Sequence, residues 1–182
     1  AYISHHTAME YYGVCDQVYY DVYVSSETPF KEFEFDGYTY CYVASKCKLG
    51  IENVHYSGGV RITDKERTTL DSIKDMDKIS GIEEVLANID GFTSLNEEKL
   101  TGYLQEYHNQ FLYQKTGFIL YPYRDKLGLS HSFFEMCQYK TGKSKRYLTK
   151  EFTNGTYIKE WKLVVPDEIY KLKNGAFQDD RI

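Results

Sequence analysis

Several motifs that assign a function directly are missing from this sequence. Its four cysteines include no CxxC pair, its five histidines include no HxxxH pair, and its glycines form neither GxGxxG nor GxxxxGK. Structural zinc sites, dinucleotide-binding sites and P-loops are typically marked by such spacings. The sequence therefore predicts no metal site and no cofactor. It also predicts no catalytic residue, since nothing ties a cysteine to a histidine base.

Proline and long apolar runs are also scarce. The chain has only three prolines and no low-complexity tract, which argues against a disordered linker. No segment resembles a signal peptide or a membrane-spanning helix. We therefore interpret the cysteines as reduced thiols in a cytoplasmic protein without membrane contact. Extracellular disulfides are the alternative, because the sequence begins at Ala1 rather than methionine.

Tyrosine, by contrast, is abundant, with 19 copies among 182 residues. Its ring packs in half-buried strands and its hydroxyl stays hydrated at contact surfaces, so the count favours either sheet structure or recognition. Charge is unevenly distributed. Residues 1–60 hold three Lys/Arg and eight Asp/Glu, residues 61–120 hold seven and eleven, and residues 121–182 hold twelve and eight. The basic C-terminal third suggests an acidic partner.

Residues 1–63 predict a mainly β region, an antiparallel sheet with hairpins. Residues 18–24 alternate apolar and polar side chains like a half-buried strand. Asp36-Gly37 separates two further strand-like runs and predicts a type I′ turn, because this pair tolerates positive φ angles. Residues 54–63 add at least one more strand.

The central region, residues 64–142, predicts four to five helices. Three helix starts share one pattern, an oxygen-bearing cap followed three residues later by glutamate, and such a capping box satisfies two amide donors reciprocally. The pairs are Thr63 with Glu66, Ser80 with Glu83, and Ser94 with Glu97. Further along, Pro122 should end or kink the helix that contains it.

Strand character returns in residues 143–182. The runs KRYLT and TYIKEWKLVV flank Asn154-Gly155, which predicts a terminal β-hairpin. Sheet, helices and hairpin follow one another without an internal repeat. The sequence therefore predicts a single α+β domain over residues 1–182, with segregated elements.

Charged residues crowd the strand-to-helix junction VRITDKERTTLDSI, residues 60–73. Arg67 and Asp71 are four residues apart and can pair across one helical turn. If they face inward they must be paired, and they would lock the helix to the sheet, which is the interpretation we favour. The alternative is an enzyme acting on nucleic acid, with acidic ligands or general bases at this junction. Its candidate residues are Asp64, Glu66 and Asp71.

The segment YKTGKSKRYLTK, residues 139–150, interleaves cations with two tyrosines. This pattern suits a phosphate backbone with stacking bases, or an acidic protein face. Its alternative is a solvated loop and a hairpin edge protected by lysine. The candidate residues for binding a partner or nucleic acid are Lys140, Lys143, Lys145, Arg146 and Lys150.

Four motifs follow one another along the chain: a [ST]-A-[LM]-x-x-x-G helix, an E-R-T-x-x-D junction, a glycine opening a short helix, and an [RK]-x-G-[FY]-x-L segment. The matching residues are Thr7, Ala8, Met9 and Gly13; Glu66, Arg67, Thr68 and Asp71; Gly81; and Lys115, Gly117, Phe118 and Leu120. In this order, over nearly the whole chain, they resemble the C-terminal region of AbiEi-type antitoxins. We expect the residues of the second motif to be structural.

The resemblance implies the antitoxin half of a type IV toxin–antitoxin pair, a non-enzymatic regulator in bacterial phage defence by abortive infection. The implied functional partner is a nucleotidyltransferase-like toxin, neutralised with or without direct contact. Proteins of the family also carry an N-terminal winged helix that binds DNA and represses their own promoter. No winged helix precedes Ala1, so we expect this chain alone not to bind the promoter in that way. The remaining alternative is a protein-interaction module that docks its partner on the tyrosine-rich sheet of residues 18–43.

Overall fold

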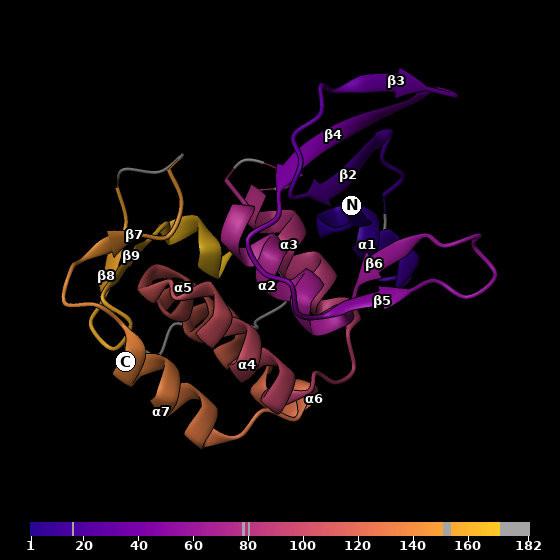
Figure 1. The fold of residues 1–182 in the computed structure, drawn as a ribbon. Helices are drawn as coiled ribbons and strands as arrows, with labels where there is room; N and C mark the ends of the chain where they lie inside the picture. Colours follow the sequence, from indigo (N-terminus) through magenta and orange to yellow (C-terminus); the bar gives the residue numbers. More distant parts are fainter. Residues whose placement is uncertain (16, 78, 80, 151–153, 172–182) are drawn as a thin grey trace.

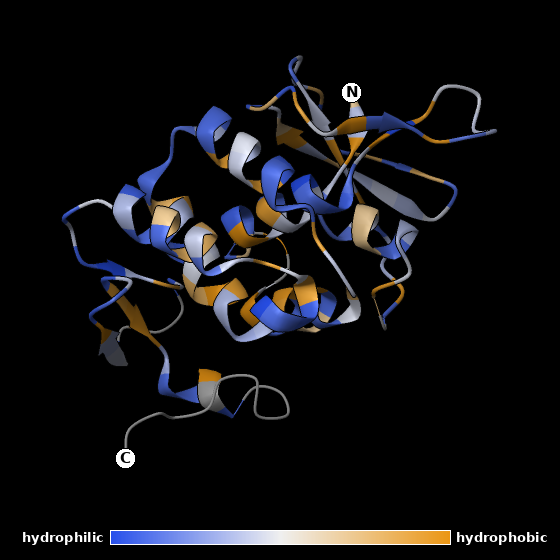
Figure 2. Cartoon of the chain, turned by 90° about the horizontal axis from the view of Figure 1, so that it is seen from below, coloured by the Kyte–Doolittle hydropathy of each residue, from blue (hydrophilic) through white to orange (hydrophobic). Residues whose placement is uncertain are grey.

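The computed structural model describes residues 1–171, except residues 16, 78, 80 and 151–153. It confirms the predicted α+β fold class. A six-stranded sheet and a small three-stranded sheet lie on opposite sides of a group of helices (Figure 1). Hydrophobic segments are concentrated in the central helices and in the strands that pack against them (Figure 2).

The large sheet has the strand order β3-β4-β2-β1-β6-β5. Its strands are β1 (Tyr2–Ile3), β2 (Asp21–Ser26), β3 (Phe33–Phe35), β4 (Tyr38–Ala44), β5 (Ile51–Asn53) and β6 (Arg61–Thr63). The sheet is mixed rather than wholly antiparallel, because β2 lies parallel to β4 and β1 lies parallel to β6. After β2, the connection over residues 27–32 leads to β3, which does not pair with β2. Strand β4 lies between them, parallel to β2 and antiparallel to β3.

The Asp36-Gly37 turn and the strand expected in residues 54–63 are both present. Phe35 pairs with Tyr38 across Asp36 and Gly37, whose φ angles of 51° and 78° are those that a type I′ turn requires. Strands β5 and β6 pair antiparallel around a second loop that contains Gly58, at φ 71°. These two local predictions are therefore confirmed.

Seven α-helices and two short 3₁₀ helices lie within the described part of the chain. They are α1 (His5–Tyr11), α2 (Lys65–Asp75), α3 (Gly81–Gly91), α4 (Glu97–Tyr107), α5 (Gln110–Leu120), η1 (Tyr121–Tyr123), α6 (Arg124–Leu127), α7 (His131–Lys140) and η2 (Asp167–Tyr170). The central region holds six of the α-helices rather than four to five, one of them the single-turn α6.

The cap of α2 differs from the prediction by one residue. Asp64, not Thr63, occupies the cap position, and its Oδ1 accepts from the amide of Arg67 at 2.8 Å. Glu66 does not reach back to the cap. Its carboxylate accepts instead from the amide of Asn96 at 2.7 Å, so it ties α2 to the start of α4.

The cap of α4 also moves. Asn96, not Ser94, caps this helix and accepts from an amide in the first turn at 3.0 Å. Glu97 accepts from the amide and hydroxyl of Ser130, at 2.6 and 2.8 Å, and so fixes the start of α7. The third predicted capping box begins at Ser80, which lies outside the described residues.

Helix α5 ends at Leu120, two residues before Pro122, as the proline predicts. Gly117 lies near this end and faces the ring of Trp161. A Cβ at this glycine would lie 2.0 Å from the nearest ring carbon, so no side chain fits without displacing the tryptophan. The glycine of the fourth motif is thus a close contact between α5 and the small sheet.

The C-terminal hairpin is not where the sequence places it. Strands β7 (Arg146–Tyr147), β8 (Thr156–Ile158) and β9 (Leu163–Val165) form a sheet of order β7-β9-β8. The antiparallel pair is β8 with β9, which turns at residues 159–162 inside the run expected to be one strand. Because β7 pairs with β9 in parallel, Asn154-Gly155 cannot be the turn of a hairpin between its flanking runs.

Candidate functional site

The charges of the 60–73 junction form a buried structural network. Arg67 is 2% exposed, and its Nε donates to Asp71 Oδ1 at 2.9 Å. Its other nitrogens donate to the carbonyls of Cys47 and Leu49, at 2.9 and 2.8 Å, and to the hydroxyl of Tyr2 at 3.2 Å. Helix α2 is therefore locked to strand β1 and to the β4–β5 connection, as inward-facing burial of this pair predicts.

Each of the junction carboxylates accepts at least one hydrogen bond from the protein itself. Asp64 accepts from the Tyr103 hydroxyl at 2.6 Å and from Lys99 Nζ at 2.9 Å, besides capping α2. Asp71 accepts from the Tyr107 hydroxyl as well as from Arg67. Burial and the Asp71 carboxylate raise the pKa of the Tyr107 hydroxyl far above its ordinary value, so it stays a donor.

Thr68, the remaining member of the second motif, is buried and also serves the fold. Its hydroxyl donates to the Asp64 carbonyl at 2.7 Å and lies 2.7 Å from the hydroxyl of Thr63. No group of three or more His, Cys, Asp or Glu side chains within the described residues is arranged to hold a metal ion. The geometry of this junction therefore favours the structural interpretation over an acidic active site.

The two N-terminal histidines are buried. His5 is 1% exposed, with Nδ1 2.8 Å from Ser4 Oγ and Nε2 3.3 Å from Asp75 Oδ2. His6 stacks on the ring of Tyr19 at 4.2 Å between centroids. The Ser4–His5–Asp75 chain resembles a catalytic triad in residue type, but Ser4 is fully buried and cannot meet a substrate.

The four cysteines are free, as expected for reduced thiols. Burial raises the pKa of the Cys137 thiol to about 12 and that of Cys41 to about 11. Neither thiol is a thiolate near neutral pH, so neither is an activated nucleophile.

The basic segment divides between two places. Lys140 ends α7, and Lys143 and Lys145 lie on the exposed connection to β7. Arg146 and Lys150 lie closer to the helices: the Arg146 guanidinium is 5.8 Å from the ring centroid of Phe111, and Lys150 lines a cavity with the same phenylalanine. The five cations of the segment therefore do not form one continuous surface, because they lie in different surroundings.

That cavity has a volume of about 310 Å³ and lies where α2 ends and α5 begins. Its walls bring together charged side chains from distant parts of the chain, and we call it the lysine cavity. The charged residues that line it are Lys46, Lys74, Asp75, Asp77, Lys115 and Lys150.

The pKa values of two of these groups are shifted from their ordinary values. Lys115 is 3% exposed, and burial lowers the pKa of its ammonium group; Asp77, 3.8 Å away, only partly offsets this effect. Burial alone would raise the pKa of Asp75, but His5 and Lys74 hold it well below its ordinary value. The cavity thus contains the buried ammonium group of Lys115, which has no carboxylate of the described residues within hydrogen-bond distance, and the ionised carboxylate of Asp75.

A second surface feature is an uncovered face of the large sheet. Helix α1 covers the Tyr23 side of this sheet, where His6 meets Tyr23 edge-on at 4.7 Å. On the opposite side, the cross-strand pairs bring apolar and aromatic side chains together, and we call this side the aromatic face. Its residues are Val22, Val24, Phe30, Phe33, Phe35, Tyr38, Tyr40 and Tyr42.

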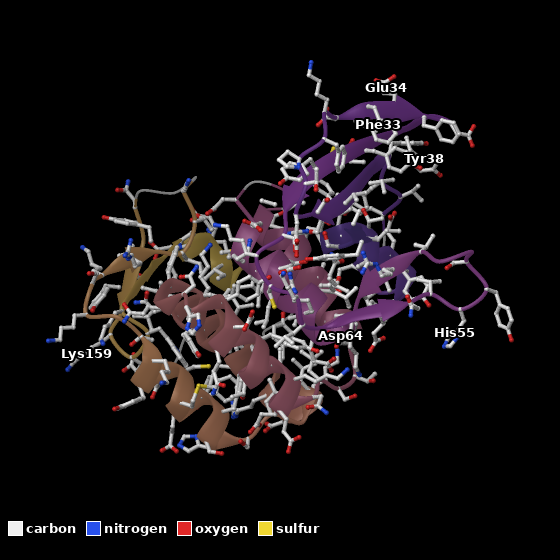
Figure 3. All side chains as sticks on the ribbon, viewed as in Figure 1. Phe33, Glu34, Tyr38, His55, Asp64 and Lys159 are labelled. Carbon is white, nitrogen blue, oxygen red and sulfur yellow. The ribbon has the colours of Figure 1, made fainter. Side chains whose placement is uncertain are left out.

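The aromatic face is contiguous and open. Phe33 stacks on Tyr40 with centroids 4.8 Å apart, and Phe30 links Phe33 to Tyr42 at 6.0 and 5.4 Å. Phe33 is 50% and Phe35 67% exposed. Figure 3 shows Phe33, Glu34 and Tyr38 on the hairpin that projects from the body of the molecule. The tyrosine-rich segment therefore presents a continuous apolar surface at the sheet edge.

Three of the four lysines of the cavity were not among the candidate residues identified from sequence. Lys46, Lys74 and Lys115 are up to 69 residues apart, so no spacing rule links them. One signal was available: Lys115 interrupts the apolar helix QFLYQKTGFIL, where a lysine facing the core needs a partner or a function.

Comparisons with protein-family models, with curated proteins and with solved structures return no match. Within the described residues, no helix is long and apolar enough to cross a membrane. The fold and its sites define an α+β domain with an aromatic sheet face and a separate lysine-lined cavity.

Proposed function

We propose that this chain is a non-enzymatic, protein-binding regulatory domain, the toxin-neutralising part of an AbiEi-like antitoxin and transcriptional regulator. Its partner in this proposal is a nucleotidyltransferase-like toxin of a bacterial abortive-infection system. Promoter binding is assigned to a winged helix outside this chain. The observation that carries the proposal is the uncovered aromatic face.

Exposed apolar surface of this extent favours a partner. Soluble proteins seldom leave a contiguous aromatic patch open to water, and aromatic residues are enriched in the centres of protein–protein interfaces. The hairpin also leaves β3 as an edge strand, with backbone donors and acceptors available for pairing. Both features suit a protein ligand better than a small molecule.

Charge identifies the kind of partner. Residues 18–44 hold five carboxylates and one lysine, and the exposed side chains of Glu32, Glu34 and Asp36 belong to the hairpin that carries the aromatic face and to the residue before it. Such a surface is complementary to a basic protein surface with apolar side chains. An enzyme that handles nucleotides and RNA needs a basic substrate-binding surface, so a toxin of this class matches the charge of the hairpin.

The resemblance motifs support the same proposal indirectly. The residues of the second motif are used to bury and connect α2, and Gly117 of the fourth motif is used to admit Trp161. The motifs thus maintain a scaffold, as expected of a domain whose role is binding. The junction carboxylates that an acidic active site would use already accept hydrogen bonds from the protein itself.

The test is toxin rescue in cells. The chain is co-expressed with the toxin encoded beside it, either unchanged or with Phe33→Ser, Phe35→Ser and Tyr40→Ser combined. We expect the unchanged chain to restore growth and the triple variant to lose rescue, with purified toxin no longer retained on the immobilised domain. The matched control is Tyr56→Ser with Tyr139→Ser, which removes exposed rings outside the aromatic face.

Rescue by the triple variant at the level of the unchanged chain would rule out the aromatic face as the toxin contact. Failure of the unchanged chain to rescue, in spite of its folding, would remove the antitoxin assignment itself. Equal loss in the triple variant and the control would show a general effect of removing aromatic surface, and would also contradict the proposal.

A further inference from the structure

The lysine cavity is not used by the function proposed above. It lies at the junction of α2, α4 and α5, whereas the aromatic face lies on the outer strands of the large sheet. Four lysines and two aspartates line it, which gives a formal charge of +2 within about 310 Å³. This volume is at the lower end of the range for small-molecule sites.

The cations of the cavity are poorly neutralised by the protein. Lys115 is buried, and its nearest paired carboxylate, Asp77, is 3.8 Å away, beyond hydrogen-bond distance. Among the described residues, no ion pair engages the side chains of Lys46 or Lys150. Of the four lysines, Lys74 has a close carboxylate partner among the described residues, Asp75. A buried ammonium without a hydrogen-bonded counter-ion is costly, so its retention points to an anion that binds beside it.

The start of α5 adds to the positive electrostatic potential in the cavity. Asn109 caps the helix, and Asn109, Phe111 and Leu112 of the first turn line the cavity together with Lys115. The positive end of the helix macrodipole therefore lies at the cavity wall, where it favours negative charge. Asn109 Oδ1 accepts from two amides of that turn, which leaves its amide nitrogen as a further donor.

The chemistry of the donors selects the class of anion. All four cations of the lining are lysines, which bind phosphate as point charges. Two net positive charges match a ligand with two or more negative charges. We infer that the lysine cavity binds the phosphate groups of a small phosphorylated ligand.

The experiment is calorimetric titration of the purified chain with two probes, inorganic pyrophosphate and ATP, in buffer of low ionic strength. Saturable binding of one equivalent is expected, weakening as salt is added. Combined Lys46→Gln and Lys150→Gln should weaken binding about tenfold, because each removes a charge-assisted hydrogen bond from an exposed position without loss of core packing. Lys115→Met should remove measurable binding.

The controls separate binding from folding. Lys159→Gln removes an exposed lysine at the end of the molecule remote from the aromatic hairpin (Figure 3), outside the cavity lining, and should leave the dissociation constant unchanged. The melting temperature of the Lys115→Met variant should be no lower than that of the unchanged chain, because burial of the ammonium group already lowers its pKa and opposes folding.

Tighter binding of ATP than of pyrophosphate would support a nucleotide, and equal binding of the two would support recognition of the phosphates alone. The inference is overturned if neither probe saturates, if the lysine variants bind as the unchanged chain does, or if Lys159→Gln loses as much. If a single-stranded oligonucleotide binds but neither probe does, the ligand is a nucleic-acid backbone and the inference of a small ligand is wrong. Toxin rescue depends on the aromatic face, so failure here leaves the proposed function standing.

Discussion

In the helical half of the molecule, the buried Tyr103 and the half-buried Tyr107 donate their hydroxyls to Asp64 and Asp71, whereas on the outer strands Tyr38 and Phe35 are exposed to solvent. The same residue type therefore has two roles. In the first it satisfies buried carboxylates, and in the second it offers apolar area to a partner. A count of tyrosines cannot separate these roles, because burial depends on what the rest of the chain places beside each ring.

This comparison implies that changes in the helical half should cost stability, and changes on the exposed surfaces should cost binding. The largest expected effect is that of Arg67→Ala, which removes the positive charge beside Asp71 and the donor of two backbone carbonyls. We expect the free energy of unfolding to fall by about 3–5 kcal/mol. Urea denaturation measures it, and the exposed Arg61→Ala is the control. A loss below about 1 kcal/mol would show that the network does not hold α2 in place.

The next effect concerns close packing of helix and sheet. Gly117→Ala places a Cβ 2.0 Å from the Trp161 ring, so we expect a loss of about 1–3 kcal/mol. Gly102→Ala is the matched control, because it also lies within a helix but its Cβ meets nothing within 4 Å. The control should gain up to about 1 kcal/mol from helix propensity. Thermal unfolding of the two variants tests the contrast, and a similar change in both would contradict it.

Acid unfolding tests how much the buried charge of Asp75 contributes to stability. The pKa of Asp75 is held below its ordinary 3.8, so ionised Asp75 stabilises the fold above about pH 4, and this stability is lost as the pH falls. Asp75→Asn should lower the free energy of unfolding at pH 7 and flatten its dependence on pH between about 4 and 2. Denaturation curves over this range measure it, with the exposed Asp125→Asn as control. An unchanged slope would show that other carboxyls govern acid unfolding.

The smallest effect on stability is expected in the basic segment. Lys143→Glu, Lys145→Glu and Arg146→Glu together should change the free energy of unfolding by no more than about 0.5 kcal/mol per site, because all three are exposed. Rescue from the toxin, or contact with nucleic acid, should nevertheless weaken. Growth rescue and gel-shift measurements test this, beside Lys159→Glu. Unchanged rescue together with unchanged binding would show that the basic segment contacts neither the toxin nor nucleic acid.

Sequence reasoning succeeded where structure is local. The Asp36-Gly37 turn and the end of α5 before Pro122 each depend on a few adjacent residues. It failed at Asn154-Gly155, where the same turn chemistry is present but β7 pairs with β9 instead. A turn signal shows that the chain can reverse, but the pairing of strands depends on which edges meet in the folded molecule.

The candidate sites show the same division. The Arg67–Asp71 pair could be predicted from a four-residue spacing, but its burial is a feature of the folded structure. The lysine cavity could not be predicted, because Lys46, Lys74 and Lys150 come from three separate segments and meet only after α2 and α5 pack together. The cap positions differed by one or two residues because several neighbouring side chains can cap a helix equally well.

By itself, then, the amino-acid sequence determined the α+β class, the order of the sheet, helical and terminal β regions, and the pairing of Arg67 with Asp71, since these follow from periodicity and short spacings. Tertiary structure alone decided which strands run parallel, which face of the large sheet α1 leaves open, and which lysines share a cavity. Those features depend on contacts between residues far apart in the chain. The same contacts lower the pKa of Lys115 by burying it and leave Phe35 exposed, and neither result can be predicted from a local sequence pattern.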